Sequence, residues 1–233
     1  MINGALRGVG YSFSEAESVN SAVSLAQKLI LIPVSLATAF ALALIPAITN
    51  SYTSRSLRVM HRQITETFRM LLVFTLPAAI GLSLLAYPAY ITLFGLHNNH
   101  ALGGFVLMWY APSAVLFALF QVTAAMLQGI NRQRAAVVGL IGGLVVKLST
   151  NYWFIQQFHE LGTVLTTNLG LLVSISFNLW VVHRIARYRY RHLVPTVARI
   201  VVSLAVMAIA VVIGKFIFTS VLSAIPLGEY ARE

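Results

Sequence analysis

The stretch SLAQKLILIPVSLATAFALALIPAI, residues 24 to 48, decides the class of fold. It is almost entirely apolar and longer than the roughly 20 residues that a helix needs to cross a bilayer, yet it contains Lys28 and Pro33. Hydrophobic residues make up 58% of the 233 residues and charged residues 9%, with a mean hydropathy of +0.82. A soluble domain carries about a quarter charged residues. The composition therefore indicates an integral membrane protein.

Six stretches are apolar and long enough to span a membrane, and they predict an all-α polytopic bundle of about six transmembrane helices. They cover residues 23–49, 70–94, 103–128, 135–156, 162–183 and 198–224. The first 20 residues are polar and rich in Gly and Ser, so they lack the pattern of a secretory signal. Cysteine is absent, which excludes disulfides and thiolate metal sites.

The turns between these stretches alternate strictly between basic and non-basic. The basic turns are 50–69, 129–134 and 184–199, and under the positive-inside rule they face the cytoplasm. The net charge of +10 is then a topology signal and a contact to anionic lipid, so nucleic acid is not expected as a partner. This topology divides the chain into an extracytoplasmic polar segment (1–22), the transmembrane helices (23–183), a basic cytoplasmic loop (184–197) and a trailing helix with its outer end (198–233).

Both ends of the chain face outward in this topology, and no preceding span would deliver the amino terminus there. We therefore expect a piece of a longer transporter, which lacks at least one span before it and some after it.

Two consecutive spans carry small and polar residues at four-residue intervals, which places each set on one helix face. The sets are Gly139, Gly143, Lys147 and Asn151 in the first span, and Thr166, Gly170, Ser174 and Asn178 in the second. A charged side chain at a helix centre costs on the order of 3 kcal/mol in lipid, so Lys147 is expected to face protein or a wet cavity. The alternative is that its long stem extends to the outer interface near Trp153.

The first span has a similar mixed polar stripe, formed by Ser24, Lys28, Leu31, Ser35 and Thr38. Several spans also contain a proline, which removes a backbone donor; these are Pro33, Pro46, Pro77 and Pro112. Such breaks are tolerated where neighbouring helices or water satisfy the freed carbonyls, and transporters use them.

Motifs of enzymes and metal sites are missing from the sequence. There is no GxxxxGK[ST] phosphate loop, and HELGT at His159 has Thr163 where a zinc protease needs its second histidine. His97 and His100 in HNNH lack a neighbouring carboxylate. Asp is absent and the Glu residues lie in loops or near span ends, so a carboxylate proton relay is not expected. We expect neither catalysis, nor a cofactor, nor a bound metal.

Three stretches resemble the multidrug/oligosaccharidyl-lipid/polysaccharide (MOP) exporter superfamily, and especially its polysaccharide transporter and lipid II flippase branch. They are SLAQKLILIPVSLATAFALALIPAIT (residues 24–49), LQGINRQRAAVVGLIGGLVVKLSTNYWFI (127–155) and HELGTVLTTNLGLLVSISFNLWVV (159–182). The resemblance covers about residues 20–190. It implies a fold of two six-helix lobes and two trailing helices, of which this chain would supply helices eight to thirteen, including the carboxy-terminal lobe.

The resemblance also implies a function, which is flipping of undecaprenyl-pyrophosphate-linked saccharides or peptidoglycan precursors across the bacterial cytoplasmic membrane by alternating access. The cation at Lys28 would meet the pyrophosphate, although this chain has Gln27 where an acid often precedes it and Leu31 where some flippases carry an acid. Lys147 is a second candidate cation. Asn151, Thr166 and Asn178 are candidate hydrogen-bonding residues of the lining.

Two other functions stay open at this point. A cation-coupled multidrug antiporter of the same superfamily would need an intramembrane carboxylate, which this sequence does not show. A non-transporting membrane scaffold for envelope assembly fits less well with polar stripes on adjacent spans, because such stripes need a cavity or tight packing within one bundle.

Overall fold

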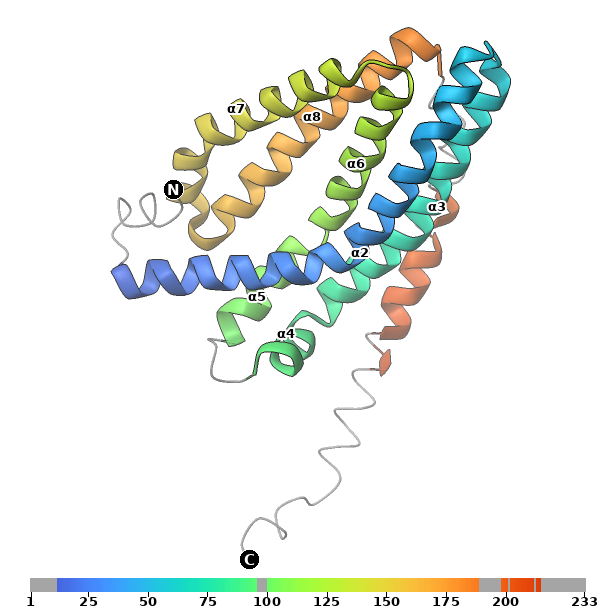
Figure 1. Cartoon of the computed structure of the whole chain (residues 1–233). Coiled ribbons are helices and arrows are strands. Elements are labelled where there is room, and N and C mark those ends of the chain that lie inside the picture. Colours follow the sequence, from blue (N-terminus) through green and yellow to red (C-terminus); the bar gives the residue numbers. More distant parts are fainter. Residues whose placement is uncertain (1–11, 96–99, 189–197, 201, 212, 215–233) are drawn as a thin grey trace, which may run out of the picture.

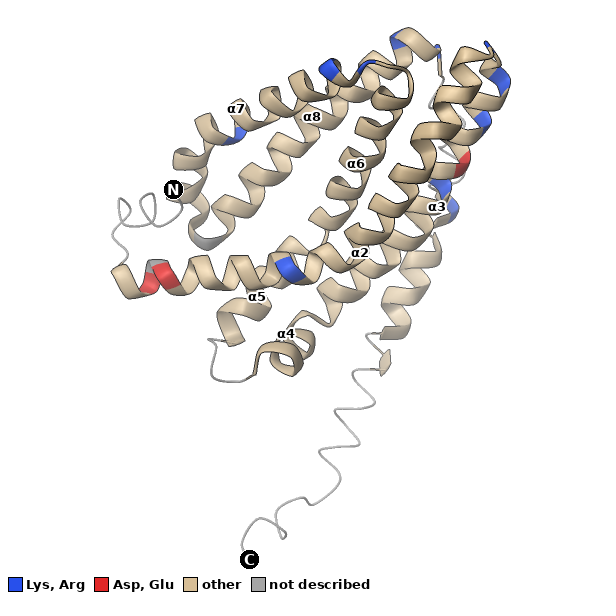
Figure 2. Cartoon of the chain, in the orientation of Figure 1, with Lys and Arg blue, Asp and Glu red and all other residues tan. Residues whose placement is uncertain are grey.

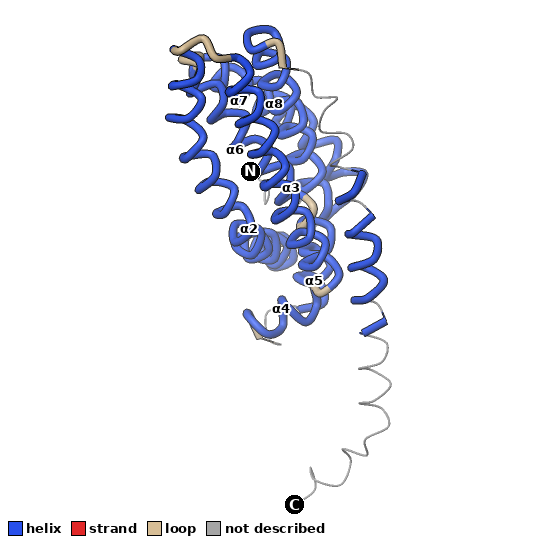
Figure 3. The backbone as a smooth tube through the Cα atoms, turned by 90° about the vertical axis from the view of Figure 1, so that its right-hand side faces the viewer, coloured by secondary structure: helices blue, strands red, loops and turns tan. Residues whose placement is uncertain are grey.

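The structure is a computed structural model that describes residues 12–95, 100–188, 198–200, 202–211 and 213–214. Every regular element in these ranges is a helix, as Figures 1 and 3 show from two directions. The elements are α2 (Phe13–Thr53), α3 (Leu57–Leu84), α4 (Ala86–Phe94), α5 (His100–Tyr110), α6 (Ser113–Gly129), α7 (Gln133–Phe158), the 3₁₀ turn η1 (His159–Leu161) and α8 (Gly162–Ala186).

The helix lengths confirm the predicted class of fold. In the described chain α2, α3, α7 and α8 are each long and apolar enough to cross a membrane, and α5 and α6 meet the same criterion only as a pair, which bends by 45° at a short break. For the predicted span 198–224, the structure describes a shorter apolar helix, Ala198–Val211, and residues 215–233 lie outside the described part. The first 11 residues of the predicted polar segment and most of the predicted basic loop, 189–197, also lie outside it.

Helix α2 extends well beyond its apolar core. It begins at Phe13 with a capping box, in which the Ser12 hydroxyl accepts a hydrogen bond from the Glu15 amide and the Glu15 carboxylate accepts one from the Ser12 amide. The helix then runs for 41 residues with Pro33 and Pro46 inside it. Figure 1 shows that α2 bends strongly along its course, and a proline inside a helix is the usual cause of such a bend.

Two apolar clusters hold the bundle together. One lies toward the end where α2 meets α3, and it includes Ile48, Met60 and Leu127. The other joins the first half of α2 to α4, α5 and the end of α7, and it includes Ile30, Tyr90 and Ile155.

Five paths of chain cross from one cluster to the other, and three of them carry a proline near the crossing point. The other two, α7 from Ala136 to Ile155 and α8 from Val164 to Val182, cross without one. In α2, Pro33 lies between Ile30 of one cluster and Ala37 of the other. In α3, Pro77 lies between Leu72 and Ala79. Between α5 and α6, Pro112 is followed by Ala114 of one cluster and then by Ala118 of the other. The bend of α2 and the 45° break between α5 and α6 therefore lie near the junction of the two clusters.

The basic turns lie together at one end of the bundle (Figure 2). The Thr49 hydroxyl lies 3.0 Å from the Gly129 carbonyl oxygen, which joins the first two basic turns. His61 Nε2 lies 2.7 Å from the Ala186 carbonyl oxygen, which joins the first to the third. The bundle therefore has one strongly basic end, as the alternation of the turns predicts. That this end faces the cytoplasm stays a prediction.

Candidate functional site

The two polar stripes identified in the sequence face each other where α7 packs antiparallel to α8. A Cβ atom on Gly139 would lie 2.7 Å from Asn178 Oδ1, so these two residues touch. A Cβ on Gly143 would collide with Ser174 Oγ and with the carbonyl oxygen of Gly170. Because the helices are antiparallel, a residue four positions later in α7 contacts a residue four positions earlier in α8. Glycine is required at this crossing because the two backbones are in direct contact.

The polar ends of the stripes are engaged with each other. The Thr166 hydroxyl lies 3.3 Å from Asn151 Oδ1 and 3.0 Å from the Gly162 carbonyl oxygen of its own helix. Asn178 is fully buried, and its amide nitrogen donates to Thr123 Oγ1 of α6 at 3.3 Å. These three predicted site residues therefore lie inside the packing of α6, α7 and α8.

An open cavity of about 280 Å³ adjoins the α7–α8 crossing. Its polar lining comes from four helices and consists of Gln27 of α2, Tyr110 of α5, Lys147 of α7, and Thr163, Thr167 and Ser174 of α8. Apolar side chains of α2, α6, α7 and α8 complete the wall, namely Val23, Phe117, Leu140, Leu144 and Leu171. The described residues that line it include no carboxylate.

Lys147 is the cation of this cavity. Its Cβ lies 3.2 Å from where a Cβ on Gly170 would stand, so its side chain leaves the crossing directly beside α8. Two hydroxyls in the lining already donate to carbonyl oxygens of α8, Thr167 to Thr163 at 2.8 Å and Ser174 to Gly170 at 3.0 Å. Their lone pairs remain as acceptors. The cavity can therefore hold an anion on Lys147 or a polar group that donates to the hydroxyls.

Lys28 lies elsewhere. Its neighbour Gln27 lines the cavity, whereas Lys28 is exposed on the surface of α2. The same surface continues through Leu31 and Ile32, whose side chains are 49% and 64% exposed. Of the five predicted site residues, one therefore lines the cavity, three lie in the adjoining packing and one lies on a separate face.

Tyr110 and Gln27 line the cavity although no sequence pattern predicted them there. Tyr110 is the last residue of α5, directly before the break at Ala111 and Pro112. A proline two residues later could have marked Tyr110 as a residue at a helix break, where a cavity can form. Nothing comparable marks Gln27. It is the sequence neighbour of Lys28, and the bend of α2 decides which of the two side chains reaches the cavity. Within the described chain no group of three or more His, Cys, Asp or Glu could hold a metal ion.

Comparisons with known proteins identify the family. The model of the family described as lipid II flippase MurJ matches residues 9–228. The chain is 44% identical over 192 residues to the lipid II flippase MurJ of Bacillus subtilis (strain 168), a match that covers 82% of this chain and 35% of that protein. It is 26% identical over 177 residues to an uncharacterized membrane protein, YabM, of the same organism, with 76% and 32% covered.

The fold is also similar to that of a solved structure of lipid II flippase MurJ in an inward closed conformation. The TM-score is 0.67 at 14% sequence identity, and the similarity covers 88% of this chain and 47% of that one. The chain thus spans about a third of the length of the curated relatives and about half of the solved structure. It is a multi-pass membrane protein of the MOP exporter superfamily, and within that superfamily it belongs to the lipid II flippase MurJ family.

Proposed function

We propose that this chain forms part of a flippase that carries a polyprenyl-diphosphate-linked peptidoglycan precursor across the bacterial cytoplasmic membrane by alternating access. The role is transport and not catalysis. The match to the lipid II flippase family supports this proposal, and so does the helical fold shared with a solved member. In this proposal the remaining length of a relative supplies the bundle opposite this one.

The observation that carries the proposal is the exposure of Lys28 on the apolar surface of α2. An ammonium group facing acyl chains costs on the order of 3 kcal/mol on insertion scales. The same group facing a wet space between two bundles keeps its hydration and costs far less. We therefore assign the face of α2 that carries Lys28, Leu31 and Ile32 to the wall of the transport pathway.

A lipid diphosphate needs a cation such as the Lys28 ammonium in the wall of its pathway. It carries about two to three negative charges through a region of low dielectric constant, where an opposite charge is worth far more than in water. Lys28 would serve as the counter-ion of the diphosphate while the polyprenyl tail stays in lipid. Lys147, in its own cavity, is a second candidate. Because Asn151, Thr166 and Asn178 bond to neighbouring helices, we propose that they support the lining and position Lys147.

The test uses a chimera in which this chain replaces the matching 192 residues of the Bacillus subtilis relative. Proteoliposomes receive a fluorescent polyprenyl-diphosphate saccharide, and a membrane-impermeant reductant reports how fast the label changes leaflet. Loss of a charge-assisted contact costs about 1.5–3 kcal/mol, so Lys28→Ala is expected to slow flipping by about 10- to 150-fold. Lys28→Glu is expected to abolish flipping, and Lys28→Arg to retain most of it.

The matched control is Ser24→Ala, which changes an exposed side chain one turn earlier on α2 and is expected to flip at the parent rate. Equal amounts of inserted protein must be shown for every variant. Parent-level flipping by Lys28→Glu would contradict the counter-ion role.

A further inference from the structure

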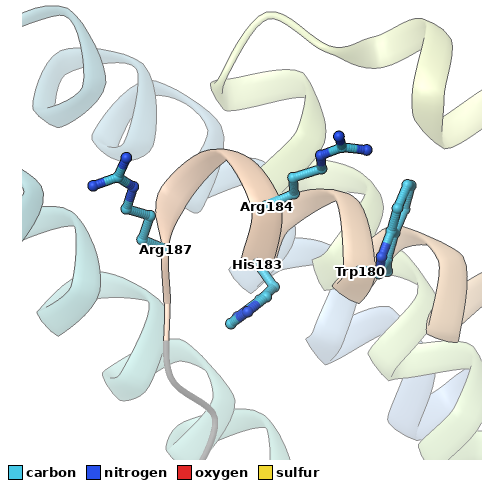
Figure 4. A pocket seen from close by; sticks show the side chains of 4 residues that line it. All are labelled: Trp180, His183, Arg184 and Arg187. Carbon is cyan, nitrogen blue, oxygen red and sulfur yellow. The ribbon is translucent and has the colours of Figure 1, made fainter.

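A second pocket lies at the basic end of the bundle, away from the cavity of Lys147. It is open, has a volume of about 520 Å³, and is lined by Trp180, His183, Arg184 and Arg187 at the end of α8 (Figure 4). Neither the polar stripes nor the proposed transport pathway makes use of these residues. An aromatic ring beside two guanidinium groups at the end of a membrane helix is a combination that requires an explanation of its own.

The geometry of the pocket is held by specific contacts. The Arg184 guanidinium carbon lies 5.4 Å from the centre of the Trp180 ring, within the range of a cation–π interaction. Figure 4 shows Arg184 extending toward Trp180, whereas Arg187 extends away from Trp180 on the other side of the last turn. His183 points to the other side, where its Nδ1 lies 2.7 Å from the Tyr188 carbonyl oxygen. Arg184 is therefore the cation that a ligand beside the Trp180 ring would meet, and Arg187 lines the other side of the pocket.

The described lining of the pocket contains no acid that would balance its charge. Among the described residues of the basic end there is one carboxylate, that of Glu66. It already forms an ion pair with Arg62 at 2.8 Å. Arg184 and Arg187 are both exposed. Basic residues in the last turn of a helix are favourable toward its dipole. The helix dipole explains the arginines but neither the neighbouring tryptophan nor the pocket. An anionic ligand explains all three features.

The surface below the pocket indicates which anion. Leu172, Ser176, Trp180 and Arg184 follow one another at four-residue steps along an exposed face of α8. Leu172 is 47% exposed and Trp180 54% exposed. The face thus runs from the apolar Leu172, past Ser176, to the aromatic Trp180 and the cationic Arg184, and its last two residues follow the order of interface and headgroups in a bilayer. A soluble anion would use the arginines alone, whereas a lipid would use the whole face.

We propose that this pocket binds the phosphate headgroup of an anionic phospholipid of the inner leaflet, with the lipid tail lying along the exposed face of α8. The Arg184 guanidinium holds the phosphate, Arg187 adds positive charge on the other side of the pocket, and Trp180 packs at the level of the glycerol. Each basic residue near an anionic surface contributes about 1 kcal/mol, so each arginine is worth about a fivefold preference for the anionic lipid.

The experiment uses the full chain in lipid nanodiscs with the substitutions Trp109→Phe and Trp153→Phe, so that Trp180 is the single tryptophan. Its fluorescence is quenched by lipids with brominated acyl chains, supplied either as phosphatidylglycerol or as phosphatidylcholine at equal mole fraction. We expect phosphatidylglycerol to associate at least about fivefold more strongly. Arg184→Gln with Arg187→Gln is expected to reduce this preference to less than about twofold.

The matched control is Arg132→Gln with Arg134→Gln, which removes two exposed arginines from another basic turn of the same end and is expected to keep the preference. Equal quenching of the parent by both lipids would overturn the proposal without any variant. A loss of preference in the control as large as in the pocket variant would also overturn it. So would displacement of the lipid by inorganic phosphate beyond the effect of chloride at equal ionic strength, because the site would then bind a soluble anion.

Discussion

Enlarging Gly143 tests whether the α7–α8 crossing sets the structure of the bundle. A methyl group at this position would collide with Ser174 Oγ and with the Gly170 carbonyl oxygen. The serine side chain can rotate away, but the carbonyl belongs to the backbone of α8 and cannot. The helices would have to separate by on the order of 1 Å, a gap that already removes a quarter to a half of each dispersion contact along the crossing.

Overpacking of this kind costs about 1–3 kcal/mol. For a chain of this size, 1 kcal/mol changes the melting temperature by about 2–4 °C, so Gly143→Ala is expected to lower it by about 2–12 °C. The measurement is the fraction of monodisperse protein that remains after heating in detergent, followed by size-exclusion chromatography.

The chain contains a matched control one residue away. A Cβ on Gly142 would meet nothing within 4 Å, and alanine in a helix is favoured over glycine by up to about 1 kcal/mol. Gly142→Ala is therefore expected to leave the melting temperature unchanged or to raise it slightly. Adding Ser174→Gly to Gly143→Ala should restore only part of the loss, because the collision with Gly170 remains. Equal shifts for Gly142→Ala and Gly143→Ala would refute the reasoning.

Two further predictions concern the basic end. Because the chain has no native cysteine, single cysteines report sidedness directly: one at Ser56 should be protected from an external impermeant maleimide and one at Gln157 should be labelled, and the reverse pattern would invert the topology. The Tyr188 hydroxyl lies 2.7 Å from Thr65 Oγ1, although Tyr188 follows the end of α8. Tyr188→Phe removes that bond and should destabilise the fold by about 0.5–1.5 kcal/mol in the same heating assay; no change in melting temperature would show that the bond contributes nothing.

The α7–α8 pair was the part of the molecule most accessible from sequence. Four-residue spacing identifies a shared helix face, and a glycine pair on such a face predicts close approach. Spacing does not name the partner, however. That Gly139 meets Asn178 and Gly143 meets Ser174 depends on the short η1 turn, which fixes the register between the two helices.

The amino-terminal helix was harder to predict. Hydropathy places the start of the first span near residue 23, but the capping box at Ser12 starts the helix at Phe13, and hydropathy does not register a polar cap. The bend in α2 also changes which side chains face inward, so the pattern alone could not separate Gln27, in the cavity, from Lys28, on the surface.

The prolines near the junction of the two apolar clusters have a mechanical consequence. A helix resists bending because every turn is tied to the next by backbone bonds, and a proline removes one of those ties. With Pro33, Pro77 and Pro112 near the same junction, three of the five paths that cross it are easier to bend there, whereas α7 and α8 cross it without a proline. The bundle could therefore flex along α2, α3 and the α5–α6 pair while α7 and α8 keep their close packing, so a carrier built on this plan could move one side of the bundle against the other.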